Sequence, residues 1–419
     1  MKLLIHGARL VSTADGLDDM LDLLIENGKI AAIGKDLSAA APDRTADASG
    51  LTLTAGLIDL FAKANEPAAE GFEDLLSAAK AGVAGGYTAL CIHTGAKTAD
   101  HLEHLLERAQ YAACDLYPSV CAVNGKDLLP YGELQLAGAK AVYEDECIDN
   151  PLRMRNALYR AKKYNIPVLS RCRDRRLYAE GVIREGTMAG LLEMPIIPAS
   201  AEAIAVARDL VLAREAGARI HIGHVSTAIS VELIRAAKRV GVKVTASTEP
   251  HYLALSSAAL QGYNTLAKFD PPLGNPEDVW ALREGLRDGV IDCIASGHTP
   301  VPMALKRRSL STAAPGASSL ETALAVALTE LCHSGQMPLG EVLACMTSAP
   351  AAVLGIPGGH VRVGDDADLL LLDPEYEWVC RGADFVSLGR NTPFEGRTLR
   401  GKPVCTIKAG RVAWGALRS

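Results

Sequence analysis

Imidazole and carboxylate side chains follow several short apolar runs of this 419-residue sequence. They belong to His93, Glu144, Asp145, His224, His251 and His298. Such groups bind metal ions or transfer protons, and a metal site needs about three or four of them converging on one point. The sequence therefore has the side-chain types of a hydrolytic or metal site, and the fold decides whether they meet.

Histidine spacing limits how these groups can meet. His221 and His224 lie three residues apart on one strand-like run, so we expect them to point to opposite faces, with only His224 facing the interior. His251 and His298 could approach His224, but the sequence shows no bridging carboxylate and no general base for them. We therefore expect structural roles for these histidines, and a hydrogen-bonded core position for His93.

Cations and an apolar ring occupy the ends of other runs. Phe61 and Lys63 share one face of their strand, because residues i and i+2 of a strand point the same way. Lys63, Arg171 and Arg173 would repel a divalent cation, and Phe61 is expected to plug the interior. The acidic pair 144–145 is expected to form salt bridges with the two arginines.

Eight apolar, β-rich runs alternate with helical patterns between about residue 55 and residue 300. They cover residues 57–61, 87–92, 117–123, 139–143, 166–170, 219–224, 242–246 and 291–296. This alternation is typical of parallel βα units, and eight is the number of strands that closes a βα barrel. The predicted fold class is α/β, with a TIM-like (βα)8 barrel that would carry catalytic groups at the C-terminal ends of its strands.

The segment after His224 shows the helical half of one unit. Ser226 and Thr227 are candidate N-caps, and Gly241 is a helix stop. Apolar residues recur between them at helical spacing, at Ile229, Leu233, Ala236, Ala237 and Val240. The sequence therefore predicts one surface helix here.

The two ends of the chain share a pattern of their own. Residues 23–34 and 405–414 each show a strand, a glycine-containing turn and a second strand, and 361–373 add another turn and strand. We therefore predict a small β-sandwich domain formed by residues 1–54 and 350–419. The barrel domain, residues 55–349, is inserted between them.

Composition excludes several classes of function. The net charge of −6 leaves no basic stripe for nucleic acid. No apolar segment is long enough to span a bilayer, and the N-terminal apolar stretch is too short for a signal peptide. Ten cysteines without Cys-x-x-Cys spacing indicate the reduced thiols of a cytoplasmic protein.

Taken in order, motifs along almost the whole chain resemble the bacterial dihydroorotases of the amidohydrolase superfamily. They include Ala55-Gly56-Leu57-Ile58-Asp59, Gly85-Gly86-Tyr87-Thr88, His221-Ile222-Gly223-His224-Val225-Ser226-Thr227, Pro271-Pro272-Leu273 and Asn391-Thr392-Pro393-Phe394-Glu395-Gly396. The resemblance implies a zinc-activated water that opens or closes the dihydroorotate ring, and an aspartate that moves the proton.

Most of the machinery that the resemblance implies is replaced in this chain. The first pair of zinc histidines corresponds to Phe61 and Lys63, and a further ligand corresponds to Arg171. The catalytic aspartate corresponds to Gly297, which leaves His224 as the isolated surviving zinc histidine. We therefore expect no catalytic residue, no metal site and no cofactor at these positions.

The implied groups for the substrate carboxylate are replaced in the same way. Asn65, Gly95 and Asp270 stand at three of these positions, and only His298 is retained. We therefore expect no substrate site of the family's type. Loss of the carboxylate clamp together with the metal and the base argues against a simple change of substrate, since losing the last two costs orders of magnitude in rate.

The resemblance then implies a role other than zinc chemistry. Dihydroorotase-like chains that lack the zinc site are non-catalytic subunits that assemble with aspartate carbamoyltransferase in some bacteria. We expect an inactive subunit of this kind, self-associating and supporting that transferase in de novo pyrimidine biosynthesis. One alternative is an amidohydrolase that acts on a cyclic amide with a reduced or absent metal site. A second is a self-assembling, non-enzymatic scaffold.

Overall fold

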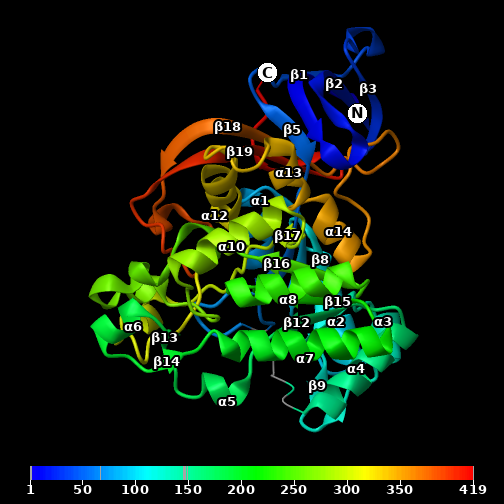
Figure 1. Cartoon of the computed structure of the whole chain (residues 1–419). Coiled ribbons are helices and arrows are strands. Elements are labelled where there is room, and N and C mark those ends of the chain that lie inside the picture. The colour runs from blue at the N-terminus through cyan, green and yellow to red at the C-terminus, as the bar shows by residue number, and fades with distance from the viewer. Residues whose placement is uncertain (1, 67, 145–147, 149, 419) are drawn as a thin grey trace.

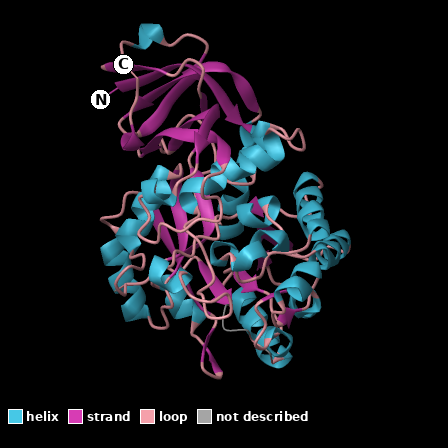
Figure 2. Ribbon diagram, turned by 90° about the vertical axis from the view of Figure 1, so that its left-hand side faces the viewer, coloured by secondary structure: helices cyan, strands magenta, loops and turns pink. Residues whose placement is uncertain are grey.

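The computed structural model describes residues 2–418, apart from residues 67, 145–147 and 149. Eight parallel strands form one sheet whose spatial order follows the chain. They are β6 (Leu57–Lys63), β7 (Tyr87–His93), β8 (Asp115–Cys121), β11 (Ala141–Glu144), β12 (Val168–Arg171), β15 (Ile220–Gly223), β16 (Val244–Thr248) and β17 (Cys293–Ile294). Helices surround this sheet in Figures 1 and 2, so the predicted α/β barrel is confirmed.

The first and last strands of the barrel are joined by side-chain and backbone contacts. Asp59 of β6 accepts hydrogen bonds from the Ser296 backbone N–H at 2.6 Å and from the Ser296 hydroxyl at 2.7 Å. Beyond it, the Lys63 N–H donates to the His298 carbonyl at 2.9 Å. Burial raises the pKa of Asp59, which is fully enclosed. These contacts close the ring where β17 is too short to do so alone.

The larger helices alternate with these strands and cover the barrel. They are α1 (Leu75–Ala84), α2 (Ala99–Ala109), α4 (Pro151–Lys163), α7 (Ser200–Ala216), α8 (Ala228–Arg239), α10 (Pro276–Arg287) and α12 (Leu320–Ala327). Shorter helices are α3 (Tyr131–Leu136), α5 (Arg175–Tyr178), α6 (Thr187–Leu192), α9 (Pro250–Ala254), α11 (Met303–Lys306), α13 (Leu339–Ala344) and α14 (Ser348–Leu354). In the described part of the chain, no helix is both long and apolar enough to cross a bilayer.

Helix α8 begins where the sequence predicted, but it buries a different stripe. The Thr227 side chain caps it by accepting from the Ser230 N–H. Val231 and Ile234 face the core, whereas Ile229 is 50% exposed and Val240 is 56% exposed. The helix carries two apolar stripes of the same period, and its packing against α7 and α10 decides which one is buried.

A second sheet combines strands from both ends of the chain. Its strands are β1 (Lys2–Ser12), β2 (Leu17–Glu26), β3 (Lys29–Gly34), β4 (Arg44–Asp47), β5 (Thr52–Ala55), β18 (Leu369–Val379), β19 (Thr398–Lys408) and β20 (Arg411–Gly415). Antiparallel pairing of β5 with β18 joins the two halves, shown in blue and orange in Figure 1. Short two-stranded ladders also pair β9 (Val123–Asn124) with β10 (Asp127–Leu128) and β13 (Ile183–Arg184) with β14 (Ile196–Ile197).

The two predicted hairpins of this sheet meet at their turns. Asn27 and Gly28 both have positive φ, as do Ala409 and Gly410, which is the backbone of a type I′ turn. A Cβ on Gly410 would lie 2.7 Å from the Gly28 Cα. Glycine therefore allows the two ends of the chain to pack together at this point. The exact domain boundaries stay a prediction.

Candidate active site

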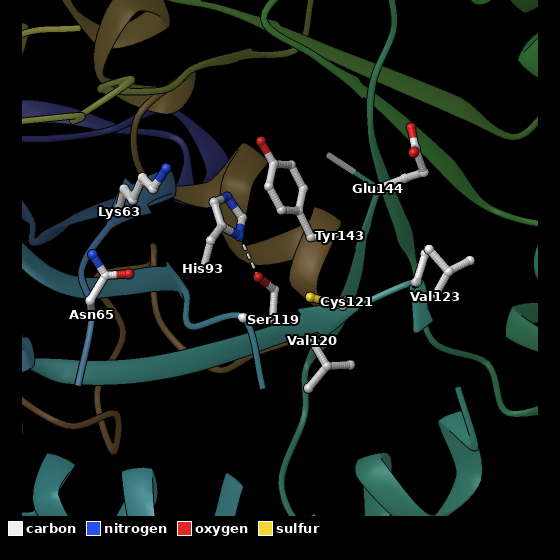
Figure 3. Close-up of a pocket in the computed structure, with 11 residues that line it drawn as sticks. Lys63, Asn65, His93, Ser119, Val120, Cys121, Val123, Tyr143 and Glu144 are labelled. Atoms are coloured by element: carbon white, nitrogen blue, oxygen red, sulfur yellow. Dashed lines mark hydrogen bonds between the residues drawn. The ribbon is translucent and has the colours of Figure 1, made fainter. Parts of the chain in front are cut away.

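A cavity of about 360 Å³ opens at the C-terminal ends of the barrel strands. Its wall includes Phe61, Lys63, Arg171, His224, Glu249, His251, Asp270, Gly297 and a loop that reaches Gly316. A smaller cavity of about 230 Å³ adjoins it, and Lys63, Asn65, His93 and Tyr143 line both (Figure 3). This is where a barrel enzyme carries its catalytic groups.

Phe61 fills the centre of the barrel mouth, as expected. Its ring centroid lies 4.3 Å from that of His224, 5.3 Å from that of His93 and 5.8 Å from those of Tyr143 and His221. The packing is tight enough that a Cβ on Gly223 would lie 2.3 Å from the ring. An aromatic plug therefore stands where metal-binding side chains are implied by the resemblance.

His221 of β15 and His224, which follows this strand, both contact the plug, so the prediction of opposite faces is wrong. His221 lies inside the barrel and shares hydrogen bonds with the Thr245 and Ser247 hydroxyls, each at 2.9 Å. Burial lowers the pKa of His221 to about 3. His224 follows the end of the strand with a φ of 57°, and this left-handed residue turns the ring back over the barrel mouth. Strand alternation does not apply beyond Gly223.

Glu249 is the carboxylate that the sequence analysis missed. It is 3% exposed, and its Oε1 pairs with His224 Nδ1 while its Oε2 lies 3.0 Å from His251 Nε2. Burial would raise the pKa of Glu249, but the two imidazoles hold it well below its usual range. The carboxylate is therefore anionic and bridges two histidines. Its position directly before Pro250-His251 was the available signal in the sequence.

Gly297 lies against this carboxylate. Its φ is 62°, and an added Cβ would lie 2.5 Å from the Glu249 Cδ. Glu249 therefore occupies the space that any larger side chain at position 297 would enter first. Whether Gly297 marks a lost catalytic position stays a prediction, but the structure shows a carboxylate beside it.

The arginines after β12 pair with Asp270, an acid that the sequence analysis did not connect with them. Asp270 Oδ2 lies 2.8 Å from Arg171 Nη2 and 2.7 Å from Arg173 Nη1, and Asp270 Oδ1 accepts from the Tyr178 hydroxyl at 2.6 Å. Glu144 accepts from the Ile148 N–H at 2.7 Å, and Asp145 lies outside the described residues, so pairing of these two acids with the arginines stays a prediction. The sequence could not place Asp270 here, because it comes from a loop about one hundred residues downstream.

The remaining predicted positions divide between the cavity and the core. Lys63 and Asn65 project from the end of β6, and Gly95 lines the smaller cavity with a φ of 68°. The Lys63 ammonium has no ion pair with any described residue and lies in the cavity wall. His93 stacks on Tyr143 at 3.7 Å and hydrogen-bonds the Ser119 hydroxyl, as the dashed line in Figure 3 shows.

His298 is enclosed rather than open to the cavity. Its Nδ1 accepts from the backbone N–H groups of Ser319 at 3.1 Å and Leu320 at 3.3 Å, and its Nε2 lies 3.8 Å from Glu73 Oε1. Burial would raise the pKa of Glu73, yet His298 and the Ser387 hydroxyl hold it at about 2. His298 therefore does not join His224 and His251.

The side chains at the barrel mouth do not fit the zinc centre that the resemblance implies. Phe61 offers no ligand atom, and Lys63 and Arg171 are cations that a divalent ion would repel. In the part of the chain that the structure describes, no three His, Cys, Asp or Glu side chains converge in a way that could hold a metal ion. The polar groups that do converge are Glu249, His224 and His251.

The eight-stranded barrel and the polar group at its C-terminal end define a class of barrel hydrolase. The amidohydrolase family model matches residues 52–413, and the chain belongs to this family. A dihydroorotase of Syntrophus aciditrophicus is 42% identical over 99% of both chains. A dihydroorotase of Pelotomaculum thermopropionicum is 40% identical over 98% of both. The solved L-hydantoinase (dihydropyrimidinase) of Arthrobacter aurescens has a TM-score of 0.86 and 26% identity, and covers 100% of this chain and 97% of its own.

These relatives overturn the expectation that the chain is not an enzyme. Relatives 37% to 42% identical over almost their whole length are named dihydroorotase, which is an enzyme. The expectation was derived from replaced positions alone. It took no account of Glu249, which the fold brings to His224 from the next strand end. The chain is a dihydroorotase-like amidohydrolase, and the non-catalytic interpretation is withdrawn.

Proposed function

We propose that this protein acts in de novo pyrimidine synthesis on a small cyclic amide of the dihydroorotate type, or on its ring-opened ureido acid. The observation that carries the proposal is the combination of 42% identity over almost the full length with a cavity at the catalytic end of the barrel. The cavity volume of about 360 Å³ suits a small heterocycle.

The side chains of the cavity suggest how such a ligand would be held. The Lys63 ammonium, which has no ion pair among the described residues, offers a counter-charge for a ligand carboxylate. His224 Nε2, opposite the nitrogen that pairs with Glu249, lies 3.4 Å from the Tyr143 hydroxyl. For ring opening, water adds to the amide carbonyl carbon, the C–N bond breaks, and the water proton passes to the departing nitrogen. An imidazole at this place could carry that proton.

The proposal is tested by calorimetry and a ring-opening assay on the purified chain. Dihydroorotate and carbamoyl aspartate are the ligands, and dihydrouracil is the uncharged comparison. We expect dihydroorotate and carbamoyl aspartate to bind saturably and the protein to convert one into the other. His224→Gln should reduce turnover by about 100-fold or more, because it removes the proton-carrying imidazole. Neither binding nor turnover, with or without added zinc, would reject the proposal.

Assembly with aspartate carbamoyltransferase is a second proposal and is compatible with activity. What supports it is a group of exposed apolar side chains on α4, α7 and α8, helices that pack side by side. These are Leu152, Ile204, Val211 and Ile229. Exposed apolar groups on neighbouring helices suit a protein partner or a second copy of this chain better than they suit solvent.

Light scattering on a sizing column tests the assembly proposal. This chain is run alone and after mixing with the aspartate carbamoyltransferase of the same cell. One heavier peak that contains both chains would support the proposal, and Val211→Glu should weaken that peak. Two unchanged peaks would reject it, and a homo-oligomer indifferent to the transferase would favour self-association alone.

A further inference from the structure

We propose that Glu249 is a positioning residue that fixes the tautomer of His224, so that the Nδ1–H of this ring points to the carboxylate and its Nε2 faces the cavity. The inference deepens the proposed function and concerns the same cavity. It assigns to Glu249 the orienting role that a buried acid plays beside a catalytic imidazole. The imidazole of His224 and the carboxylate of Glu249, which directly follow strands β15 and β16, would then act together.

The geometry around His224 leaves one orientation for the ring. The Phe61 centroid lies 4.3 Å away on one side, and Nδ1 is already paired with Glu249. Because a carboxylate only accepts hydrogen bonds, Nδ1 must carry the proton in this pair. Nε2 of the neutral ring is then an acceptor, and it lies 3.4 Å from the Tyr143 hydroxyl at the junction of the two cavities.

The second oxygen of the carboxylate faces another imidazole. His251 Nε2 lies 3.0 Å from the second oxygen of Glu249, and the His251 ring stacks on Phe269 with centroids 3.9 Å apart. Both histidines and Glu249 line the cavity wall. The pair is therefore buried on one side and open to a ligand on the other.

Gly297 is the steric condition for this arrangement. A Cβ at position 297 would lie 2.7 Å from Glu249 Oε2 and 2.9 Å from its Cγ. Only a glycine leaves the carboxylate in contact with both imidazoles. Gly297 therefore leaves room for the Glu249 carboxylate at this place.

A purely structural ion pair is the competing interpretation, and Glu202 provides the matched control. Glu202 is also 3% exposed, and it accepts from the Ser226 N–H at 3.1 Å and the Thr227 hydroxyl at 2.9 Å. It contacts no histidine in the described structure and does not line the cavity. Glu202→Gln therefore disturbs a buried carboxylate of the same kind without touching His224.

The test is nitrogen NMR of histidine side chains in the full-length protein, at roughly pH 8 where free imidazole is neutral. His224→Gln assigns the His224 signal. We expect the Nδ1–H form in the wild type and the Nε2–H form in Glu249→Gln, because the new amide can donate to Nδ1. Glu249→Asp should keep the wild-type form in part, and Glu202→Gln should keep it fully.

Kinetics give the second readout. Glu249→Gln should lower kcat by about 100-fold with little change in KM, because the wrong ring nitrogen then carries the proton. A wild-type His224 in the Nε2–H form, or a Glu249→Gln variant with unchanged tautomer and kcat, would overturn the inference. If Glu249→Gln switches the His224 tautomer as expected but the wild type does not turn over dihydroorotate, the proposed function fails while the positioning role of Glu249 stands.

Discussion

Two histidine–carboxylate pairs lie at the same end of the barrel, and they differ in what holds the imidazole. His298 is fixed by two backbone N–H donors, and its partner Glu73 is anchored by the Ser387 hydroxyl at 2.6 Å and the Leu388 N–H at 2.8 Å. His224 is paired through Nδ1 with the Glu249 side chain and stands in the cavity wall. The first pair joins the barrel to the C-terminal segment, and the second faces the cavity.

The difference shows that residue type does not determine the role of a histidine. An imidazole whose Nδ1 accepts from the backbone and whose Nε2 is enclosed contributes to folding. An imidazole whose Nδ1 donates to a carboxylate and whose Nε2 lies at a cavity can do chemistry. The partner of Nδ1 therefore distinguishes the two pairs, and each prediction below tests that distinction.

The largest effect on stability is expected at Gly297. Gly297→Ala adds a Cβ 2.5 Å from the Glu249 Cδ, and we expect a loss of about 3 kcal/mol in the free energy of unfolding. Gly289→Ala is the matched control, since its φ is 68° and it has no neighbour within 4 Å. The control should cost about 1 kcal/mol, the backbone strain alone. Equal losses of unfolding free energy for the two variants in denaturant titrations would show that the Glu249 side chain can move aside at little cost.

A substitution in the enclosed His298–Glu73 pair should lower the stability of the protein and leave the chemistry at His224 unchanged. Glu73→Gln places an amide among the donors of His298, Ser387 and Leu388, and we expect it to lower the free energy of unfolding by about 2 kcal/mol. Denaturant titration measures the loss, and histidine NMR should show an unchanged His224. A change in the His224 tautomer would mean that the two pairs are coupled rather than separate.

Lys63 lines the same cavity as the His224–Glu249 pair, and its charge should affect the binding of charged ligands only. Lys63→Met should weaken binding of dihydroorotate by about tenfold or less, because the ammonium is solvent-exposed and partly screened. Binding of uncharged dihydrouracil should not change. Calorimetry at low and high salt measures the affinity for each ligand. Equal losses of affinity for dihydroorotate and dihydrouracil would mean that Lys63 acts through the shape of the cavity and not through its charge.

Lys306 is a buried cation with no acidic partner among the described residues, and it extends the comparison. Burial lowers the pKa of Lys306 to about 7, below its usual 10.5. The unfolded chain therefore binds more protons between these values, and stability should rise with pH across this window. The free energy of unfolding of the wild type should rise by about 1 kcal/mol per pH unit relative to that of Lys306→Met. Lys80→Met, at an exposed lysine of α1, should show no such slope, and parallel curves for both variants would contradict the expectation.

Most of the barrel could be predicted from the sequence because its strands are short and apolar and alternate with helices. The hairpins were also predictable, since their turns contain glycine at residues 28 and 410. The spacing of apolar residues predicts the orientation of a side chain less well where the chain leaves regular structure. The left-handed His224 lies beyond the end of its strand, and Ile229 belongs to one of two equivalent helical stripes.

The site was harder to predict because its contacts join distant segments. Asp270 reaches Arg171 from a separate loop, and Glu249 reaches His224 from the neighbouring strand end. Motif positions could not reveal a carboxylate that arrives from elsewhere. Phe61 was the exception, because an apolar residue at the centre of a barrel has few other places to go.

The rate of dihydroorotate ring opening by the purified chain tests the central claim most directly. The assay is run with and without a zinc chelator, and with His224→Gln as the matched variant. The account predicts turnover by the wild type that the chelator leaves unchanged, and a rate lower by about 100-fold or more in the variant. Product formation no faster than the uncatalysed reaction, or equal rates for wild type and variant, would contradict it.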